Sequence, residues 1–282
     1  MKYIIQMKRY NKQHPLRVVT TFSGYDSQCL ALERLKKYDP EFEYNLVAWS
    51  EIDKYAIQAH DVLFPQYADR NLGDISKIDW SKVEDFDLFT YSFPCQSVSQ
   101  SGLQRGLAEG SGTRSSLLWE CRKAISAKKP KYLLMENVKA LVSKKFLPDF
   151  NKWLLELESY GYKNFWKVVN ATDFGVPQNR ERVFCVSILQ TDDDPKPMYA
   201  FPKGFALDKN LGDMVEKDES GQPKKVDERY YLSDKAMEYF DRVNADKSHN
   251  HNFNPKKKTD VAFTVRTLPG NRVDDNFLIY NE

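Results

Sequence analysis

The sequence predicts an α/β protein built on a mostly parallel sheet, with a short, irregular region at its C-terminal end. Apolar runs typical of buried strands alternate with helix-like segments of about ten to fifteen residues, turn-forming residues separate the two, and the alternation stops near residue 190. Such sheets bind ligands beyond the carboxyl ends of their strands, so functional residues should follow the strands. We expect strands at 17–22, 44–49, 87–91, 132–136, 164–170 and 183–188, and helices at 27–37, 54–64, 116–128, 150–160 and 233–243.

Local signals mark the ends of these elements in chain order. The first strand runs into a turn at 23–26 that contains a glycine. The second helix ends before Pro65, because proline cannot continue a helix. Apolar residues recur at helical spacing over 150–160, and Gly161 follows as a stop. Ser233 is a favourable N-cap for the last predicted helix.

A change in composition near residue 190 predicts a second region. From 191 to about 228 the chain is polar and rich in turn-forming residues, which is typical of a loop or linker. We therefore expect two parts, a folded α/β domain at 1–190 and a looser region at 191–282.

The composition is that of an ordinary globular protein. Lys and Arg total 42 and Asp and Glu total 40, so no strong positive excess indicates a nucleic-acid partner, although a locally basic surface stays open. No apolar run approaches the roughly 18 residues of a membrane span, and the N-terminal apolar stretch is too short for a signal peptide. We expect an intracellular protein without membrane contact.

The four cysteines do not have the spacing of a metal site. No pair forms a Cys-x-x-Cys motif, so neither zinc nor another metal is expected, and a reducing compartment disfavours disulfides. We interpret Cys29, Cys121 and Cys185 as small buried apolar residues. Cys95 has a different setting, because it follows a predicted strand in a loop.

A glycine and two carboxylates follow the early strands. Gly24 follows the first strand, where a glycine lets the backbone approach a ligand closely; an ordinary turn is the alternative. Glu51 ends the second strand, where an acid can accept hydrogen bonds from ribose hydroxyls or simply favour a helix N-terminus. Asp74, after Gly73, fits an acceptor for an adenine amino group or a simple turn residue.

Three later segments carry reactive or charged side chains. Cys95 is either a nucleophile, which needs thiolate character, or a structural thiol. Glu136 at the next strand end is either an acid facing the ligand or a helix cap. Gln178, Arg180 and Arg182 alternate just before the last strand, so they project to one side of a site or form a solvated turn.

In their order along the chain, these segments resemble the DNA cytosine-5 methyltransferase family over roughly residues 16–190. The stretch Phe-Pro-Cys-Gln through Gly-Thr-Arg-Ser-Ser-Leu is similar to the phage and prophage branch of that family. The matching motifs are Phe22-Ser23-Gly24, Glu51, Gly73-Asp74-Ile75, Pro94-Cys95-Gln96, Glu136-Asn137-Val138 and Gln178-x-Arg180-x-Arg182.

The resemblance implies a Rossmann-like S-adenosylmethionine-dependent methyltransferase fold, with S-adenosylmethionine as the methyl donor. It implies that Glu51 binds the ribose hydroxyls, that Asp74 binds the adenine amino group, and that Ile75 packs on the adenine ring. The further cofactor contacts that it implies are Phe22, Gly24, Ile52, Pro94 and Leu117.

The same resemblance implies the catalytic residues and a double-stranded DNA substrate. Cys95 would add to C6 of a cytosine flipped out of the duplex, which lets C5 attack the methyl group. Glu136 would contact N3 and the exocyclic amine, and Arg114 and Arg182 would be the active-site arginines. The supporting residues that it implies are Gln96, Asn137, Val138, Gln178 and Arg180.

The sequence departs from the family at two places. Asp26 stands where the family usually has glycine, and we expect its carboxylate to accept a hydrogen bond from the cofactor's amino group. The family's final Gln-x-Gly-Asn-Ser stretch and its helix are not found, so 191–282 is expected to hold a hinge and part of a target-recognition region. We expect either a fragment or a chain completed by a second polypeptide, with a self-sufficient compact enzyme as the alternative.

Three functions stay open at this point. The leading one is DNA cytosine-5 methylation in restriction-modification or phage self-protection, in the cytoplasm of a bacterial or phage-infected cell. A tRNA cytosine-5 methyltransferase is a second, and a non-catalytic S-adenosylmethionine- or DNA-binding half of a split enzyme is a third.

Overall fold

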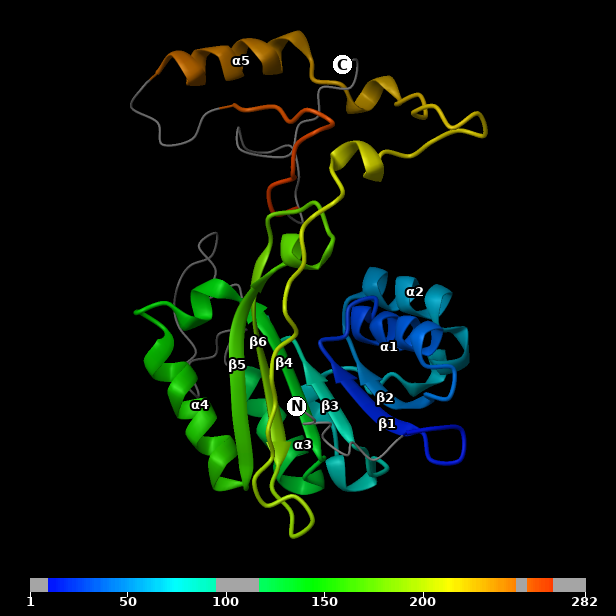
Figure 1. Ribbon diagram of the computed structural model, residues 1–282, viewed down its shortest axis with the longest axis vertical. Helices are drawn as coiled ribbons and strands as arrows, with labels where there is room; N and C mark the ends of the chain where they lie inside the picture. Colours follow the sequence, from blue (N-terminus) through cyan, green and yellow to red (C-terminus); the bar gives the residue numbers. More distant parts are fainter. Residues whose placement is uncertain (1–9, 95–116, 247–252, 266–282) are drawn as a thin grey trace. The chain divides into compact units, whose positions relative to one another are not determined.

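The computed structural model describes residues 10–94, 117–246 and 253–265 (Figure 1). Each predicted strand and helix is confirmed within a few residues of its expected bounds. The strands are β1 (Leu16–Thr21), β2 (Tyr44–Ser50), β3 (Leu88–Tyr91), β4 (Tyr132–Val138), β5 (Tyr162–Asn170) and β6 (Glu181–Leu189). The helices are α1 (Ser27–Tyr38), α2 (Lys54–Leu63), α3 (Leu118–Lys128), α4 (Leu147–Ser159) and α5 (Asp234–Ala245), and short 3-10 turns lie between them.

In the described part of the chain, six strands form one sheet in the order β2-β1-β3-β4-β6-β5. The pairs β1–β2, β1–β3 and β3–β4 are parallel, whereas β6 runs antiparallel to β4. The mostly parallel sheet is therefore as predicted. Because of these directions, the carboxyl ends of β1 to β4 and the amino end of β6 meet at one edge.

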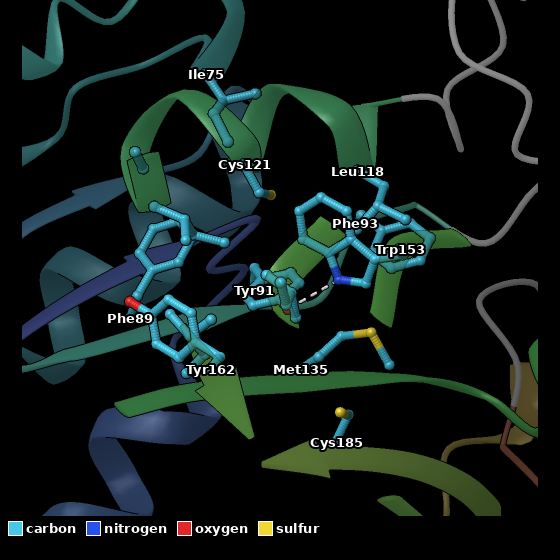
Figure 2. Packing of buried hydrophobic residues seen from close by; sticks show 14 of the residues in the cluster. Ile75, Phe89, Tyr91, Phe93, Leu118, Cys121, Met135, Trp153, Tyr162 and Cys185 are labelled. Carbon is cyan, nitrogen blue, oxygen red and sulfur yellow. Dashed lines mark hydrogen bonds between the residues drawn. The ribbon is translucent and has the colours of Figure 1, made fainter. Parts of the chain in front are cut away.

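Helices cover both faces of the sheet. Val18 and Val19 are neighbours on β1 and point to opposite faces, and they belong to two different buried clusters. One cluster joins the central strands to α3 and α4, and the other joins β1 and β2 to α1 and α2. In the first cluster, Trp153 Nε1 donates a hydrogen bond to the hydroxyl of Tyr91 at 3.1 Å, both side chains being fully buried (Figure 2).

Short polar side chains begin three of the helices. Asp26 accepts from the backbone N–H of Cys29 at the start of α1, and Asp53 accepts from two backbone N–H groups at the start of α2. Ser233 caps α5 through the N–H of Ala236, as its sequence position predicts.

The chain divides into two compact units. The first comprises 1–168 and 182–201, and the second comprises 169–181 and 202–282. Within the second unit, Ala262 exchanges backbone hydrogen bonds with Pro177 and Asn179, and the hydroxyl of Thr264 donates to the carbonyl of Asn179. Among the residues that the structure describes, no helix has both the length and the apolar character needed to cross a membrane.

Candidate active site

The loop after β1 has the backbone shape of a ligand-facing turn. Phe22 and Gly24 both lie in the left-handed region, with φ of 53° and 59°. This conformation costs energy at Phe22, since residues with a Cβ rarely adopt it, and such strain is concentrated at functional sites. Apart from the two chain neighbours of Gly24, no described atom lies within 4 Å of the position that a Cβ there would take, so the backbone is open to a close approach.

The carboxylate of Glu51 is held in place by backbone amides. Oε1 accepts from the N–H groups of Ile52 and Asp53, at 2.7 and 2.9 Å, and Oε2 accepts from the N–H of Gly24 at 2.9 Å. Glu51 is half-buried. Its orientation is thus fixed by the loops after β1 and β2 together. Among the described contacts, Oε1 accepts two hydrogen bonds and Oε2 accepts one, so an acceptor site remains on Oε2 for a ligand.

The loop at 71–75 supplies a second oriented carboxylate. The amide and hydroxyl of Ser76 both donate to Asp74, and they hold the pKa of Asp74 below its ordinary value. Ile75 is only 3% exposed and packs in the core, which differs from the expectation that its side chain covers a bound ring. Ile52, at 72% exposed, offers an accessible aliphatic surface next to Glu51 instead.

Asp26 requires a correction. Its side chain is fully buried, and its oxygens accept from the hydroxyl of Thr20 at 2.7 Å and from the N–H of Cys29 at 3.0 Å. Burial raises its pKa, and His60 Nε2 lies 3.8 Å away. Asp26 does take the left-handed conformation that a glycine would, with φ of 64°. The carboxylate therefore caps α1 and braces the loop, and it does not face a cofactor's amino group.

An oppositely charged pair lies at the carboxyl end of β4. Arg182 Nε is 3.0 Å from Glu136 Oε1, and both side chains are largely shielded from solvent. The antiparallel register brings them together: Val138 lies opposite Arg182 and Glu136 lies opposite Phe184, so the two charged residues form a diagonal pair on one face. A carboxyl group held in this way can accept a hydrogen bond from a polar ligand at the edge of the sheet when it is ionised, and can donate one when it is protonated.

Asn137 joins this carboxylate to the loop after β3. Its Nδ2 donates to the carbonyl of Phe93 at 2.9 Å, and its own Oδ1 accepts from the N–H of Val138. Asn137 and Phe93 are both buried. The chain that leads through Pro94 is thus tied to the end of β4. The predicted residues Cys95, Gln96 and Arg114 lie outside the described residues.

The remaining predicted residues have other surroundings. Leu117 and Val138 are half-buried and pack against the main core. Gln178 and Arg180 belong to the second unit, where Gln178 Oε1 accepts from the N–H of Val265 at 3.4 Å and the N–H of Arg180 donates to Asn170.

The other three cysteines are buried free thiols, which confirms that they are small apolar residues of the core. Burial raises the pKa of each thiol, to about 11 for Cys185. None of these three is a thiolate at neutral pH.

Two residues that the sequence analysis did not single out also lie at this edge. Asn71 hydrogen-bonds to the backbone of Glu51 and of Gly73, and the hydroxyl of Ser50 donates to the carbonyl of Gly73 at 2.6 Å. An available signal was the position of Asn71 two residues before a glycine, which is typical of an Asx turn.

Comparison with known proteins decides the family. The model of the family described as C-5 cytosine-specific DNA methylase matches residues 16–273. The chain belongs to this family. Members of the family use S-adenosylmethionine as the methyl donor, and the chain has the S-adenosylmethionine-dependent methyltransferase fold.

Individual relatives agree with this assignment. The chain is 52% identical over 177 residues to the Type II methyltransferase M2.ScrFI of Lactococcus lactis subsp. cremoris, covering 63% of this chain and 46% of that protein. It is 35% identical over 175 residues to the orphan methyltransferase M.Rho11sI of Bacillus phage rho11s, covering 62% and 33%. The chain thus spans less than half the length of these two relatives.

A solved structure agrees at the level of fold. The crystal structure of the S. pombe Dnmt2 methyltransferase superposes with a TM-score of 0.60 at 18% sequence identity, covering 87% of this chain and 68% of that chain.

The described residues fit the methyl donor of the family. S-adenosylmethionine presents ribose hydroxyls, an adenine amino group and an apolar ring face. The edge of the sheet offers an amide-held carboxylate at Glu51, an ionised acceptor at Asp74, an exposed aliphatic side chain at Ile52, and an open backbone at Gly24. These groups match the donors and the apolar face of the cofactor in kind.

Proposed function

We propose that the chain transfers a methyl group from S-adenosylmethionine to C5 of cytosine in double-stranded DNA. The observation that carries the proposal is the arrangement at the end of β4. There Arg182 orients Glu136, and the adjacent Asn137 anchors the chain at Phe93, two residues before Cys95. Membership of the C-5 cytosine-specific DNA methylase family supports the choice of substrate.

In this proposal, residues that follow β2 and residues of the loop at 71–75 hold the cofactor. Glu51 accepts hydrogen bonds from the ribose hydroxyls, Asp74 accepts from the adenine amino group, and Ile52 covers part of the ring. The bound cofactor supplies an electrophilic methyl group on a sulfonium.

The protein groups then make cytosine C5 reactive. The thiolate of Cys95 adds to C6, forming an Sγ–C6 bond and shifting an electron pair toward C5. Glu136 holds a proton at N3 as this charge develops, and Arg182 keeps the carboxyl group in position. After C5 has accepted the methyl group, a base removes the C5 proton and the Sγ–C6 bond breaks, which restores the thiolate. The target base must leave the stack for Cys95 to reach C6.

The names of the relatives suggest the biological setting. One is a Type II methyltransferase and another is an orphan methyltransferase of a phage. We infer a role in restriction-modification or phage self-protection, in the cytoplasm of a bacterial or phage-infected cell. A second polypeptide that adds recognition contacts is part of the same proposal.

A trapping experiment tests the covalent step. The chain is incubated with S-adenosylmethionine and long duplex DNA synthesised with 5-fluorocytosine, which contains many candidate target sites. Fluorine at C5 cannot leave as a proton does, so the Sγ–C6 adduct persists as a protein–DNA species that survives denaturation. Such a species with the wild type and its loss in Cys95→Ser are expected. No adduct from a wild type that binds both the cofactor and the DNA, or an equal yield from Cys95→Ser, would contradict the proposal.

A further inference from the structure

The segment that follows the 3-10 turn at Pro65–Arg70 extends the sheet beyond β2. Asn71 forms a parallel bridge with Trp49, and the N–H of Leu72 donates to the carbonyl of Trp49 at 2.7 Å. This pairing brings Gly73 and Asp74 alongside the residues that follow β2. The backbone pairing sets the direction of this segment. The side chain of Asn71 sets the distance between the segment and the loop that carries Glu51.

The amide of Asn71 uses its acceptor and its donor on these two loops. Oδ1 accepts from the N–H of Glu51 at 3.2 Å and from the N–H of Gly73 at 2.9 Å, and Nδ2 donates to the carbonyl of Glu51 at 3.2 Å. The reverse orientation would place an NH₂ group against two backbone N–H groups, so the partners determine how the amide is turned. The short contact between Ser50 Oγ and the Gly73 carbonyl is a second tie between the same loops.

These three hydrogen bonds of Asn71, here called the Asn71 clamp, act indirectly, because they hold the backbone of the groups proposed to bind the cofactor. The carboxylate of Glu51 is oriented by Gly24, Ile52 and Asp53, but the backbone that carries it is held at both its N–H and its carbonyl by Asn71. The same side chain sets the backbone at Gly73, directly before Asp74. When the loops of a site are already ordered, binding does not carry the entropic cost of ordering them, and the affinity for the ligand is higher.

We propose that Asn71 is a positioning residue that holds the ribose-binding and adenine-binding sides of the cofactor site in one geometry. The proposal rests on the proposed function, because it takes Glu51 and Asp74 as the cofactor-binding carboxylates. Aspartate cannot replace Asn71, since a carboxylate has no donor for the Glu51 carbonyl and adds a negative charge near Glu51.

The test is calorimetric binding of two probes, S-adenosylhomocysteine and 5′-methylthioadenosine, to the full chain. Both probes carry adenine and ribose, and only the first carries the amino-acid part. Asn71→Ala should raise both dissociation constants by about tenfold and by the same factor, which corresponds to the net value of about one hydrogen bond. Asn71→Asp should weaken the binding of both probes by a similar factor. This variant tests the role of Asn71 if Asn71→Ala does not fold.

The matched control is Asn45→Ala. Asn45 also accepts a side-chain hydrogen bond, from Arg70 at 2.8 Å, but it lies near the opposite end of β2. Its removal should leave both dissociation constants within twofold of the wild type. Hydrogen exchange of the ligand-free chains should become faster in peptides spanning 50–53 and 71–75 of the Asn71 variants, with other regions unchanged.

The outcomes separate the two proposals. A wild type that binds neither probe overturns the proposed function, and this inference with it. A wild type that binds both, with Asn71 variants that bind equally well, overturns only the role of Asn71. Equal weakening in Asn45→Ala, or faster exchange throughout the Asn71 variants, shows a general structural effect and overturns it too.

Discussion

Glu136 is the carboxyl group to which the proposed function assigns a proton at the cytosine ring. Its side chain pairs with Arg182 at the carboxyl end of β4, and both side chains are largely shielded from solvent, with exposed fractions of 28% for Glu136 and 17% for Arg182. For a pair shielded to this extent, the cost of desolvating both charges offsets the Coulombic gain, so the pair is weak evidence for a role in stability. We therefore infer that Arg182 orients the carboxyl group of Glu136 for contact with a ligand, as the proposed function states.

Replacing this carboxyl group tests that view. Glu136→Gln keeps the size of the side chain but cannot supply a proton as a carboxylic acid, so we expect methyl transfer to DNA to fall by about 100-fold or more while the cofactor still binds. Transfer of a labelled methyl group measures the effect. Glu156→Gln is the control, because Glu156 also lies near an arginine, Arg122 at 3.8 Å, but on α4. A Glu136 variant as active as this control would exclude the acid role.

The buried thiols give a second prediction at this scale. Burial raises the pKa of Cys29, Cys121 and Cys185, so folded Cys95→Ser chains should take up almost no iodoacetamide at pH 8, and unfolded ones should be alkylated at all three positions. Mass spectrometry of peptides reads the result. Rapid alkylation of any of the three in the folded chain would mean that the core is more open than its packing indicates.

The order of strands and helices follows from sequence periodicity, but their side-chain connections do not. Apolar spacing predicted α4, and proline and glycine marked the ends of α2 and α4. The antiparallel direction of β6, which creates the Glu136–Arg182 pair, has no local signal, because strand direction depends on the whole chain. Asp26 was misjudged for a similar reason, since its partners Thr20 and His60 lie on β1 and α2.

The contact between β3 and α4 provides a stability test. Tyr91→Phe removes one hydroxyl and leaves Trp153 Nε1 buried without its acceptor, so we expect the free energy of unfolding to fall by about 1–3 kcal/mol. Urea denaturation measures this change. Tyr38→Phe is the control, because Tyr38 is 88% exposed. Removing its hydroxyl should leave the free energy of unfolding almost unchanged. Equal stabilities for the two variants would show that the hydrogen bond is not a net contributor.

The stacking of α2 on β2 predicts a dependence on pH. His60 is buried, stacks on Trp49 with ring centroids 3.6 Å apart, and faces Asp26 and Asp61. Burial lowers the pKa of His60 from 6.5 in the folded chain. Between that lowered pKa and pH 6.5, His60 is therefore protonated in the unfolded chain but neutral in the folded chain. The stability contributed by neutral His60 is complete above pH 6.5 and is lost as the pH falls toward the lowered value.

Unfolding free energies measured in urea at pH 7, 6 and 5 check this direction. The wild type should lose stability on acidification with a slope of at most about 1.4 kcal/mol per pH unit from this group. His60→Gln cannot titrate here, so its slope should be shallower. A steeper slope in His60→Gln would mean that His60 is charged in the folded chain.

For the whole molecule, the sequence predicted the sheet, its helical layers and the edge that carries the candidate site. It placed Glu51 and Glu136 at strand ends, and parallel strands bring their carboxyl ends to one edge. It did not predict the clamp at Asn71, since that side chain reaches Glu51, 20 residues away in sequence. Local patterns describe neighbours along the chain, whereas this tie depends on the folded path of both loops.

The most direct measurement of the central claim is transfer of a labelled methyl group from S-adenosylmethionine to unmethylated duplex DNA by the full chain. We predict label in the DNA with the wild type and none above background with Cys95→Ser, while Cys95→Ser still binds the cofactor. Full transfer by Cys95→Ser, or no transfer by a wild type that binds both cofactor and DNA, would contradict the assignment of this edge of the sheet as a cytosine-methylating site.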